Sequence, residues 1–504
     1  MKSRKKLRAL AGVMLCVLGF WLALATPYRR QTVVTDAASC RMAVDIIEPL
    51  SGAPRGSVLL LHGISANKKI MSYFGQGFSE QGLRVFIPDL PGHGRTAGPF
   101  SPARAEACTE SFVRELIAVR LLTPDRSILA GHSMGGAIAI RVASHVPVAG
   151  VLAISPAPMR PAHGTSPEML LFDNPPELKG NALVISGGWE PKSMRGAAQD
   201  LAASGGEGGT KHVIVSRATH VSLLFDREAL RASQDWAAQV LHLDDHTRLP
   251  SRWPVLGFLA GFSGLILLTA PFLRELLGKS SLTEPNLHGN IARLFLELIA
   301  CSVGAVLLLR WNNFLRVLHV FGGDYLAGFL LLLGLLLVLL HHKDILAVFQ
   351  ANPAPAQLRQ ILKAAVSAFA ILFLFSGWFD LTFSASWLDT ARWLRFPAFF
   401  LAFLPYHAAE EIVAGPPTSG GSIKRLALTL SLRLMAWGAL LAGIFSLHSG
   451  QILLMLLAPY FGLFCLLQRA SMDAVRRETG SAAAAAVFGA ILMAGFSLAI
   501  FPVA

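Results

Sequence analysis

A serine framed by glycines is the first feature of this chain that could do chemistry. Ser133 lies in the stretch 128-ILAGHSMGGAIAI-140, with Gly131 and Gly135 two residues away on either side. An apolar run precedes this GxSxG pattern and a helix-forming run follows it, which is the setting of a sharp strand-to-helix turn that exposes a serine hydroxyl. Glycines are needed there because the turn is tight and neighbouring backbone passes close to it. The pattern predicts that Ser133 is a nucleophile; the alternative is a serine that only caps the helix.

A serine hydroxyl needs a general base, and that base needs an acid to orient it. In sheets with such a turn, the acid and then the histidine follow the serine in the chain, at the carboxyl ends of later strands. The apolar run 182-ALVISGG-188 leads into Glu190, and the run 212-HVIVSRA-218 leads into His220. We therefore predict that Glu190 is the acid and His220 the base for Ser133.

Other residues of the same region fit these roles less well. His212 begins its strand, at the edge of the sheet opposite to the predicted site. The run 149-AGVLAIS-155 leads into Pro156 with no acid nearby. His163 and Asp173 lie in the loop that follows and are weaker candidates. The alternative to the predicted triad is that its acid and its histidine are loop residues without a role.

The regular elements that would position these residues alternate between strands and helices. This alternation predicts an α/β fold with a mostly parallel, doubly wound sheet. The apolar runs are continuous, as expected for strands that are covered on both faces. Strands are expected within 57–63, 83–94, 127–131, 149–155, 182–188 and 212–218, and helices near 68–81, 103–122, 136–146, 193–203 and 228–241.

Together these motifs resemble the α/β-hydrolase superfamily. The resemblance rests on 131-GHSMGG-136, on His62-Gly63 and on 89-DLPGHG-94, and it covers about residues 55–243. Within the superfamily, the chain looks most like the lysophospholipase, monoacylglycerol lipase and serine aminopeptidase branch. It departs from that branch in having Glu where Asp is commoner as the acid. The segment 156–180 is also too short for a large helical cap, so a small lid or an open site is expected.

The resemblance implies a complete site for acyl transfer. By this resemblance Ser133 is the nucleophile, Glu190 the acid and His220 the base. The backbone N–H groups of Ile64 and Met134 would form the oxyanion hole. No cofactor is implied, and no cluster of His, Cys, Asp or Glu residues has the spacing of metal ligands.

The hydrophobic residues of the chain are unevenly distributed. They make up 53% of the 504 residues and form long runs mainly after residue 254. We predict an N-terminal membrane anchor or signal peptide at 1–28, a hydrolase domain at 29–248 and a transmembrane domain at 249–504. Candidate spans lie near 254–273, 291–309, 322–340, 364–381, 396–413, 429–447, 450–468 and 482–502.

The N-terminus begins with MKSRKKLR, and an apolar run from Ala9 to about Pro27 follows. A run of this length can cross the hydrocarbon core of a bilayer. We favour an uncleaved anchor over a signal peptide removed near Leu24-Ala25-Thr26, because the run is long for a signal peptide.

The net charge of +13 does not indicate a nucleic-acid partner, because no basic face is interleaved with aromatic residues. The Lys and Arg residues lie mainly at the ends of apolar runs. If the hydrolase domain is outside, the inside connections hold fifteen Lys and Arg residues and the outside connections four. This bias predicts a hydrolase domain that faces away from the cytoplasm, and the composition favours a bacterial inner membrane. Cys40 and Cys108 could then form a disulfide in an oxidising compartment.

Ionisable residues also occur within the apolar half of the chain. His407 and Glu411 are spaced i and i+4 in 405-PYHAAEEIVAG-415, so they share a helix face, and Glu297 lies in another candidate span. Ionisable groups inside a membrane often mark sites or pathways. His407 and Glu411 are therefore a second candidate site. The alternative, which we favour, is that this span ends near Ala408 with the acids at the cytoplasmic surface.

The sequence thus predicts a membrane-embedded serine hydrolase that cleaves ester bonds, and less readily amide bonds, of lipid or acylated substrates. An acyltransferase is a variant of this prediction with another acceptor. The alternative class is a multi-span transporter or sensor whose α/β domain is a non-catalytic binding module. A missing member of the triad would have favoured that class, and none is missing.

Overall fold

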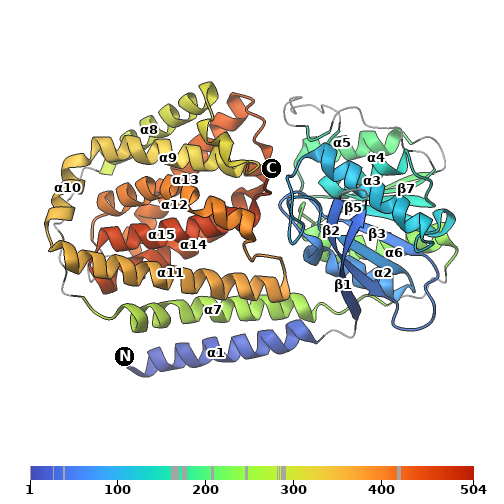
Figure 1. Ribbon diagram of the computed structural model, residues 1–504, viewed down its shortest axis with the longest axis horizontal. Helices are drawn as coiled ribbons and strands as arrows, with labels where there is room; N and C mark the ends of the chain where they lie inside the picture. Colours follow the sequence, from blue (N-terminus) through green and yellow to red (C-terminus); the bar gives the residue numbers. More distant parts are fainter. Residues whose placement is uncertain are drawn as a thin grey trace. The chain divides into compact units, whose positions relative to one another are not determined.

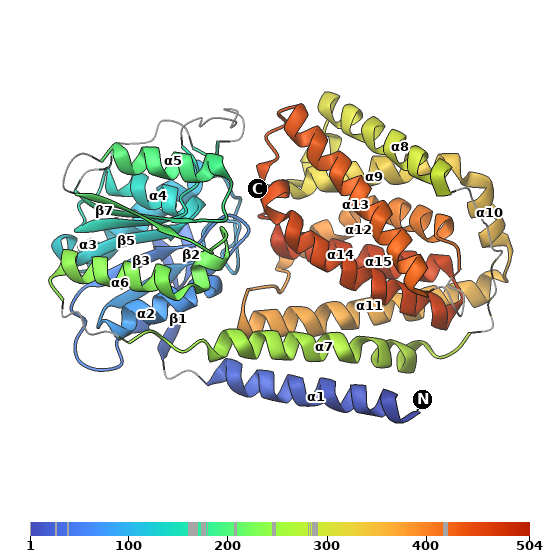
Figure 2. The same cartoon turned by 180° about the vertical axis from the view of Figure 1, so that it is seen from behind.

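The computed structural model describes residues 2–25, 28–37, 40–159, 170–172, 178, 180–205, 209–243, 248–280, 282, 284, 291–416 and 422–504. These residues form two compact units. The sheet unit comprises Leu22–Leu256, Asp380–Ala385 and Pro502–Ala504. The helical unit comprises Met1–Trp21, Gly257–Phe379 and Ser386–Phe501. Figures 1 and 2 show both units from opposite sides.

The sheet unit contains an eight-stranded sheet in the order β1-β2-β4-β3-β5-β6-β7-β8. Strands β3 to β8 pair in parallel, whereas β1 pairs with β2, and β2 with β4, in antiparallel fashion. The predicted mostly parallel α/β sheet is therefore confirmed. The strands are β1 (Arg29–Ala37), β2 (Cys40–Glu48), β3 (Ser57–Leu61), β4 (Arg84–Pro88), β5 (Ser127–His132), β6 (Gly150–Ile154), β7 (Asn181–Gly187) and β8 (Thr210–Val215).

Two strands at one edge of the sheet, β1 and β2, are absent from the sequence prediction. The β1 segment RRQTVVTDA is polar and largely exposed, so it lacks the continuous apolar run by which the central strands were recognised. Every residue of β3, β5 and β6 is buried, as is typical of strands covered on both faces.

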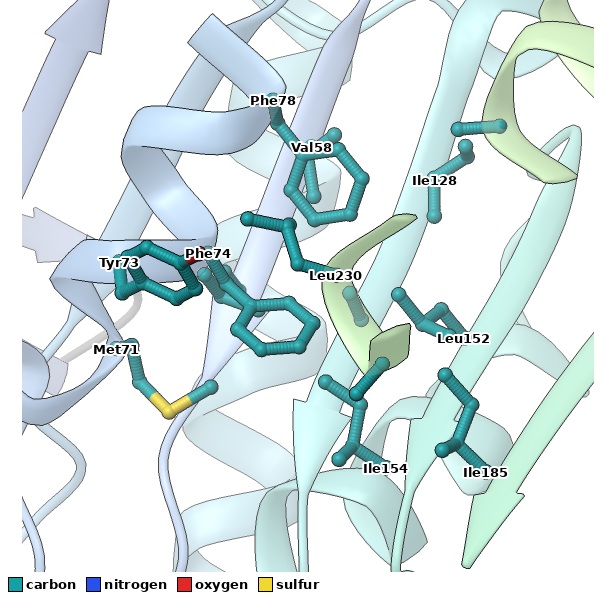
Figure 3. Packing of buried hydrophobic residues seen from close by; sticks show 14 of the residues in the cluster. Val58, Met71, Tyr73, Phe74, Phe78, Ile128, Leu152, Ile154, Ile185 and Leu230 are labelled. Atoms are coloured by element: carbon teal, nitrogen blue, oxygen red, sulfur yellow. The ribbon is translucent and has the colours of Figure 1, made fainter. Parts of the chain in front are cut away.

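Helices cover both faces of this sheet (Figures 1 and 2). On one side lie α2 (Ser72–Glu80) and α6 (Arg227–Leu241), and on the other α3 (Pro102–Ala118), α4 (Met134–Ala143) and α5 (Lys192–Ala203). Figure 3 shows Phe74, Phe78 and Leu230 of the first pair packed against Val58 and Leu152 of the strands. Full burial of each such side chain is worth about 1.5–3 kcal/mol, so this layer fixes the strands that carry the site.

Cys40, at the start of β2, and Cys108, in α3, form a disulfide with a Cα–Cα distance of 5.4 Å. The bond closes a loop between residues 68 positions apart in sequence. We expect the Cys40→Ser/Cys108→Ser variant to lose about 3–4 kcal/mol of unfolding free energy, because the open chain gains entropy when unfolded. Denaturant unfolding with and without dithiothreitol checks this. Reductant should weaken the wild type alone, and equal sensitivity of both proteins would contradict the prediction.

The helical unit is built from α1 (Lys2–Leu24) and nine further helices after the sheet unit (Figure 1). These are α7 (Trp253–Leu277), α8 (Ile291–Trp311), α9 (Gly323–Leu340), α10 (His342–Gln350), α11 (Ala354–Thr382), α12 (Thr390–Val413), α13 (Ser422–Ser446), α14 (Ile452–Thr479) and α15 (Ala482–Ile500). Among the described residues, eight helices are long and apolar enough to cross a membrane: α1, α7, α8, α9, α11, α13, α14 and α15.

Of the eight spans predicted after the hydrolase domain, 396–413 is the one without a counterpart among these eight helices. Its residues do form a helix, α12, but that helix is not among the apolar spans. The polar residues His407, Glu410 and Glu411 within the predicted range make it less hydrophobic than the other spans. The helix is nevertheless well buried in the helical unit, with His407 and Glu411 fully enclosed.

Helix α1 packs directly on α7, and the two helices lie side by side with α11 in both views (Figures 1 and 2). A Cβ atom added at Gly19 would lie 2.4 Å from the backbone N of Gly261, and one at Gly264 would lie 2.6 Å from the carbonyl O of Gly12. The backbones therefore touch through glycines, as in the small-residue contacts of membrane helices.

Candidate active site

The turn between β5 and α4 presents Ser133 at the carboxyl end of the central strand. Ser133 has φ 53° and ψ −118°, a strained backbone conformation for a residue with a side chain. Three backbone hydrogen bonds hold it: the Ser133 N–H donates to Ile154 O at 2.9 Å, and Ser133 O accepts the N–H groups of Ala157 at 2.9 Å and of Ala137 at 3.1 Å. The strand, the sharp turn and the helix that the GxSxG pattern predicts are all present.

The glycines of the pattern have no room for a side chain. A Cβ atom at Gly131 would lie 2.2 Å from Gly135 O, and one at Gly135 would lie 2.5 Å from Leu61 O. Both clashes are with backbone, so neither can be relieved by a side-chain rotation. The turn at Ser133 therefore requires glycine at both positions, for the packing reason that the sequence suggests.

Glu190 and His220 follow β7 and β8 and meet at the same edge of the sheet. The His220 Nδ1–Glu190 Oε1 distance is 2.8 Å, and Glu190 Oε2 accepts the Gly187 N–H at 2.8 Å. Burial alone would raise the pKa of Glu190, but hydrogen bonds from His220 and Ser155 outweigh it and lower the pKa. Glu190 is thus an ionised carboxylate that holds Nδ1–H of His220 and leaves Nε2 as the basic nitrogen.

Ser155, which sequence reasoning did not single out, belongs to the same cluster. It follows β6 with φ 45°, and its Oγ hydrogen-bonds to Glu190 Oε1 and lies 2.8 Å from His220 Nδ1. Its position directly after a central strand was the available signal, because residues there share the edge that carries the site.

His132, next to Ser133, forms a hydrogen bond to the backbone of His220. Its Nε2–H donates to the carbonyl O of His220 at 2.8 Å, and the two imidazole rings lie 4.7 Å apart. Burial, together with the neighbouring His220, lowers the pKa of His132 to about 3. His132 is therefore neutral near pH 7 and positions the His220 backbone without adding charge.

Ser133 and His220 are not directly hydrogen-bonded to each other in this structure. Among the described residues, no hydrogen bond joins Ser133 Oγ to the His220 ring. Hydrogen bonds of this kind often tighten only when a substrate binds. The structure thus brings Glu190, Ser155 and His220 into direct contact and places Ser133 beside them, one residue from His132.

The two predicted oxyanion-hole donors have no acceptor among the residues that the structure describes. These are the backbone N–H groups of Ile64, after β3, and of Met134, the first residue of α4. A Cβ atom at Gly63 would lie 3.1 Å from Ser133 Cβ, so the loop after β3 runs directly beside the serine. Met134 also lies at a helix N-terminus, where partial positive charge favours an oxyanion.

The motifs 62-HG-63 and 89-DLPGHG-94 fix the loop that carries Ile64. His62 Nε2 accepts the Leu90 N–H at 3.0 Å, and His93 Nε2 accepts the Ser65 N–H at 3.3 Å. The two histidine rings lie 5.1 Å apart. The loops after β3 and β4 are therefore bonded to each other beside the serine.

Lys68 begins the 3-10 turn that follows this loop, and its side chain is buried among acids. Lys68 is buried, with Nζ 3.4 Å from Asp45 Oδ1 and 3.7 Å from Asp89 Oδ2. The Asp89 carboxylate also accepts the backbone N–H groups of Lys68 and Arg95. Lys68 is therefore a buried cation that links the acids of β2 and of the loop after β4.

The second candidate site, His407 and Glu411, lies in the helical unit within a larger buried ionic network. Helix α12 does not end near Ala408; it continues to Val413, and both acids that follow His407 are buried. His407 contacts Glu410 (Nδ1–Oε2, 3.5 Å) rather than Glu411. The expected end of the span near Ala408, with the acids at a surface, is therefore wrong.

The ionic network joins three helices. Glu410 of α12 binds Arg433 of α13 at 2.6 and 2.8 Å and Arg469 of α14 at 3.2 Å. The remaining ion pairs are Glu411 with Arg425 and Arg469, and Asp473 with Arg425 and Arg469. Three arginines thus pair with three acids, so the network carries no net charge and connects α12, α13 and α14.

Two further sequence expectations can be placed only in part. His163 and Asp173, the weaker triad candidates, lie outside the described residues. Within the described ranges, no three His, Cys, Asp or Glu side chains gather where they could hold a metal ion.

The residues that form this site lie within a region that is similar to known proteins. Residues 58–279 match a family model described as the alpha/beta hydrolase family. The chain is 36% identical over 101 residues to the magnesium-chelatase 30 kDa subunit of Rhodobacter capsulatus, covering 20% of this chain and 34% of that protein. It is 33% identical over 121 residues to the pimeloyl-[acyl-carrier protein] methyl ester esterase of Aromatoleum aromaticum, covering 22% of this chain and 43% of that protein. The chain thus spans less than half the length of these curated relatives.

Solved structures with a similar sheet include the carboxylesterase EstE1 from a metagenomic library, with 16% identity and a TM-score of 0.36. That match covers 47% of this chain and 96% of the esterase. A CIB-like hydrolase from Thermoplasma acidophilum has 20% identity and a TM-score of 0.34, covering 43% of this chain and 100% of that protein. The family match spans the loops after β3, β5, β7 and β8, which carry the candidate site.

Proposed function

We propose that this α/β-hydrolase domain, followed in the chain by long apolar helices, makes the protein a membrane-bound serine esterase. Its substrates would be lipid or acylated carboxylic esters. The observation that carries the proposal is the strained Ser133 turn beside a histidine whose Nδ1 is bound to the buried Glu190. A serine that only capped a helix would need neither the strained backbone nor the paired histidine. The similarity to an enzyme named as a methyl ester esterase supports ester cleavage over amide cleavage.

The proposed mechanism follows from the positions of these groups. His220 Nε2 takes the proton of Ser133 Oγ as the oxygen attacks the ester carbonyl carbon. Glu190 stabilises the imidazolium that forms, and the N–H groups of Ile64 and Met134 stabilise the oxyanion. The tetrahedral intermediate collapses, the alcohol leaves with the proton of His220, and an acyl-Ser133 remains. Water, activated by His220, then releases the carboxylic acid.

We also propose that the sheet unit lies outside the cytoplasm. The Cys40–Cys108 disulfide supports this location, because disulfides persist mainly in oxidising compartments. The excess of Lys and Arg in the predicted inside connections before α12, ten against two outside, supports it independently. Proteolysis of intact spheroplasts would cleave an outward-facing domain and spare an inward-facing one.

Fluorophosphonate labelling of membranes that contain the full-length protein tests the activity. The wild type should be labelled, and Ser133→Ala should not be, because the probe reacts only with an activated serine. Ser144→Ala is the matched control: Ser144 lies at the other end of α4, bonded to Arg141 O, and its loss should leave labelling unchanged. Equal labelling of Ser133→Ala would move the nucleophile elsewhere. An unlabelled but folded wild type would favour a non-catalytic binding domain.

A further inference from the structure

A short segment from the apolar half of the chain belongs to the sheet unit. Residues Asp380–Ala385 comprise the last three residues of α11 and the first three of the connection to α12, and they belong to the sheet unit rather than to the helical unit. We call them the 380–385 segment. Its sequence is DLTFSA, which combines one acid, one aromatic ring and hydroxyl groups.

The first anchor of the 380–385 segment is ionic and lies on the loops beside the oxyanion hole. Asp380 Oδ2 lies 3.0 Å from Arg95 Nη2 and 3.5 Å from Lys69 Nζ. Asp380 is therefore the shared counterion of two cations that repel each other. Burial is the largest cause that lowers the pKa of Lys69, and the charge of Arg95 lowers it further, whereas the charge of Asp380 raises it. Without this carboxylate, Lys69 and Arg95 should move apart.

The second anchor is a hydrogen bond to the oxyanion loop itself. Asn67 Nδ2 donates to Ser384 Oγ at 2.7 Å. The Asn67 side chain also accepts the Lys69 N–H at 3.1 Å, so it ties the end of the loop to the turn that follows. Asn67 is buried and lies three residues after Ile64, whose N–H is a proposed oxyanion donor.

The third anchor lies on the opposite side of Ser133. Phe383 stacks on Phe225, with ring centroids 5.6 Å apart and an interplanar angle of 24°. Phe225 ends the 3-10 turn Ser222–Phe225, which begins two residues after His220. The 380–385 segment therefore contacts the loops after β3, β4 and β8.

These three anchors place the segment across the site. In the sheet, β3 and β8 are four strand spacings apart, or about 19 Å, with β5 and its Ser133 between them. Asp380 and Phe383 are three residues apart and can span only about 11 Å. The long side chains at both ends, of Lys69 and Arg95 on one side and of Phe225 on the other, add to this reach, so the segment bridges the two groups of loops across the intervening strands.

We propose that the 380–385 segment is a positioning element of the hydrolase site, with Asp380 holding the loop that carries the Ile64 N–H. This inference rests on the proposed function. The oxyanion donor acts most strongly in the transition state, so a displaced loop should slow the chemical step more than it weakens substrate binding. Asp380 does not contact the reacting atoms and acts through Lys69 and Arg95.

Steady-state hydrolysis of p-nitrophenyl butyrate by the full-length protein in detergent tests this role. Asp380→Asn should lower kcat about tenfold with KM changed less than twofold, and Asp380→Glu should recover most of the loss. Ser384→Ala should lower kcat about threefold. The matched control is Asp389→Asn, in the same connection: Asp389 caps α12 and pairs with Arg392, and Asn keeps the cap, so kcat should not change.

The outcomes separate the two proposals. A wild type that is neither labelled at Ser133 nor active on esters overturns the proposed function and this inference with it. An active wild type with unchanged kcat in Asp380→Asn and Ser384→Ala overturns the positioning role alone. An effect confined to KM also overturns it. A thermal unfolding scan of each variant identifies a loss of kcat that comes from unfolding, and Ser384→Ala, the milder change, then decides.

Discussion

Alanine at Ser133 or at His220 is expected to lower kcat for an activated ester by about 10⁴- to 10⁶-fold, and the double variant is expected to lose no more. The reason is that the serine and the histidine act as one unit: without the base the hydroxyl is not activated, and without the hydroxyl the base has no proton to take. The residual rate should come from substrate binding and the oxyanion donors.

Steady-state rates of the two single variants and the double variant form the cycle that measures this coupling. Losses that multiply in the double variant would contradict a shared step, because they would mean that the two residues act independently. His212→Ala is the control. His212 lies within β8 and bonds to Ser186 Oγ, away from the carboxyl end of its strand, so its replacement should leave kcat within about twofold.

The parts of the site that sequence predicts best are those whose signal is local. The GxSxG pattern around Ser133 combines a strand, a turn that needs glycine and a helix within a few residues, so it can be read without tertiary information. Glu190 and His220 follow apolar runs, and parallel strands bring such positions to one edge. The structure accordingly places Glu190 2.8 Å from His220.

Other parts depend on contacts that no local pattern contains. Ser155 joins the cluster because its backbone has a positive φ and its Oγ turns toward Glu190, which the neighbouring strands decide. The 380–385 segment lies more than 150 residues beyond His220 in sequence. The edge strand β1 is polar, because one of its faces meets solvent, and so it lacks the apolar run of a central strand.

The distribution of charge in the helical unit shows a further limit. The count of positive residues in the connections treats every Arg as lying at a membrane surface. Arg425, Arg469 and Arg476 enter that count, yet all three are buried, and Arg469 lies inside α14. These arginines neutralise buried acids, and Arg392 of the outside connections is buried as well, so twelve rather than fifteen inside residues and three rather than four outside residues remain as topology signals. The connections after α12 keep their sides only if 396–413 spans the membrane. The connections before α12 show the same bias without that condition, with ten Lys and Arg residues inside and two outside.

Replacing Arg469 by Met is expected to destabilise the helical unit by about 3–5 kcal/mol, because it leaves buried acids without their cation. Arg469 is fully buried and pairs with Glu410, Glu411 and Asp473. Its removal changes a balanced network of three arginines and three acids into one with an excess negative charge. Thermal or denaturant unfolding of the purified full-length protein in detergent measures the loss.

Two further variants make the explanation specific. Arg274 of α7 pairs with Glu478 of α14, but the Arg274 side chain is about half exposed. Arg274→Met should therefore lower the free energy of unfolding by less than about 1 kcal/mol. Asp473→Asn, added to Arg469→Met, removes the excess charge and should restore part of the stability, giving a favourable coupling in the double-mutant cycle. If Arg469→Met cost no more than Arg274→Met, or if Asp473→Asn only added to the loss, charge balance would not be what connects α12, α13 and α14. A recovery in the double variant would show that the network stabilises the helices as a neutral set, in which each arginine is needed because its acids are buried.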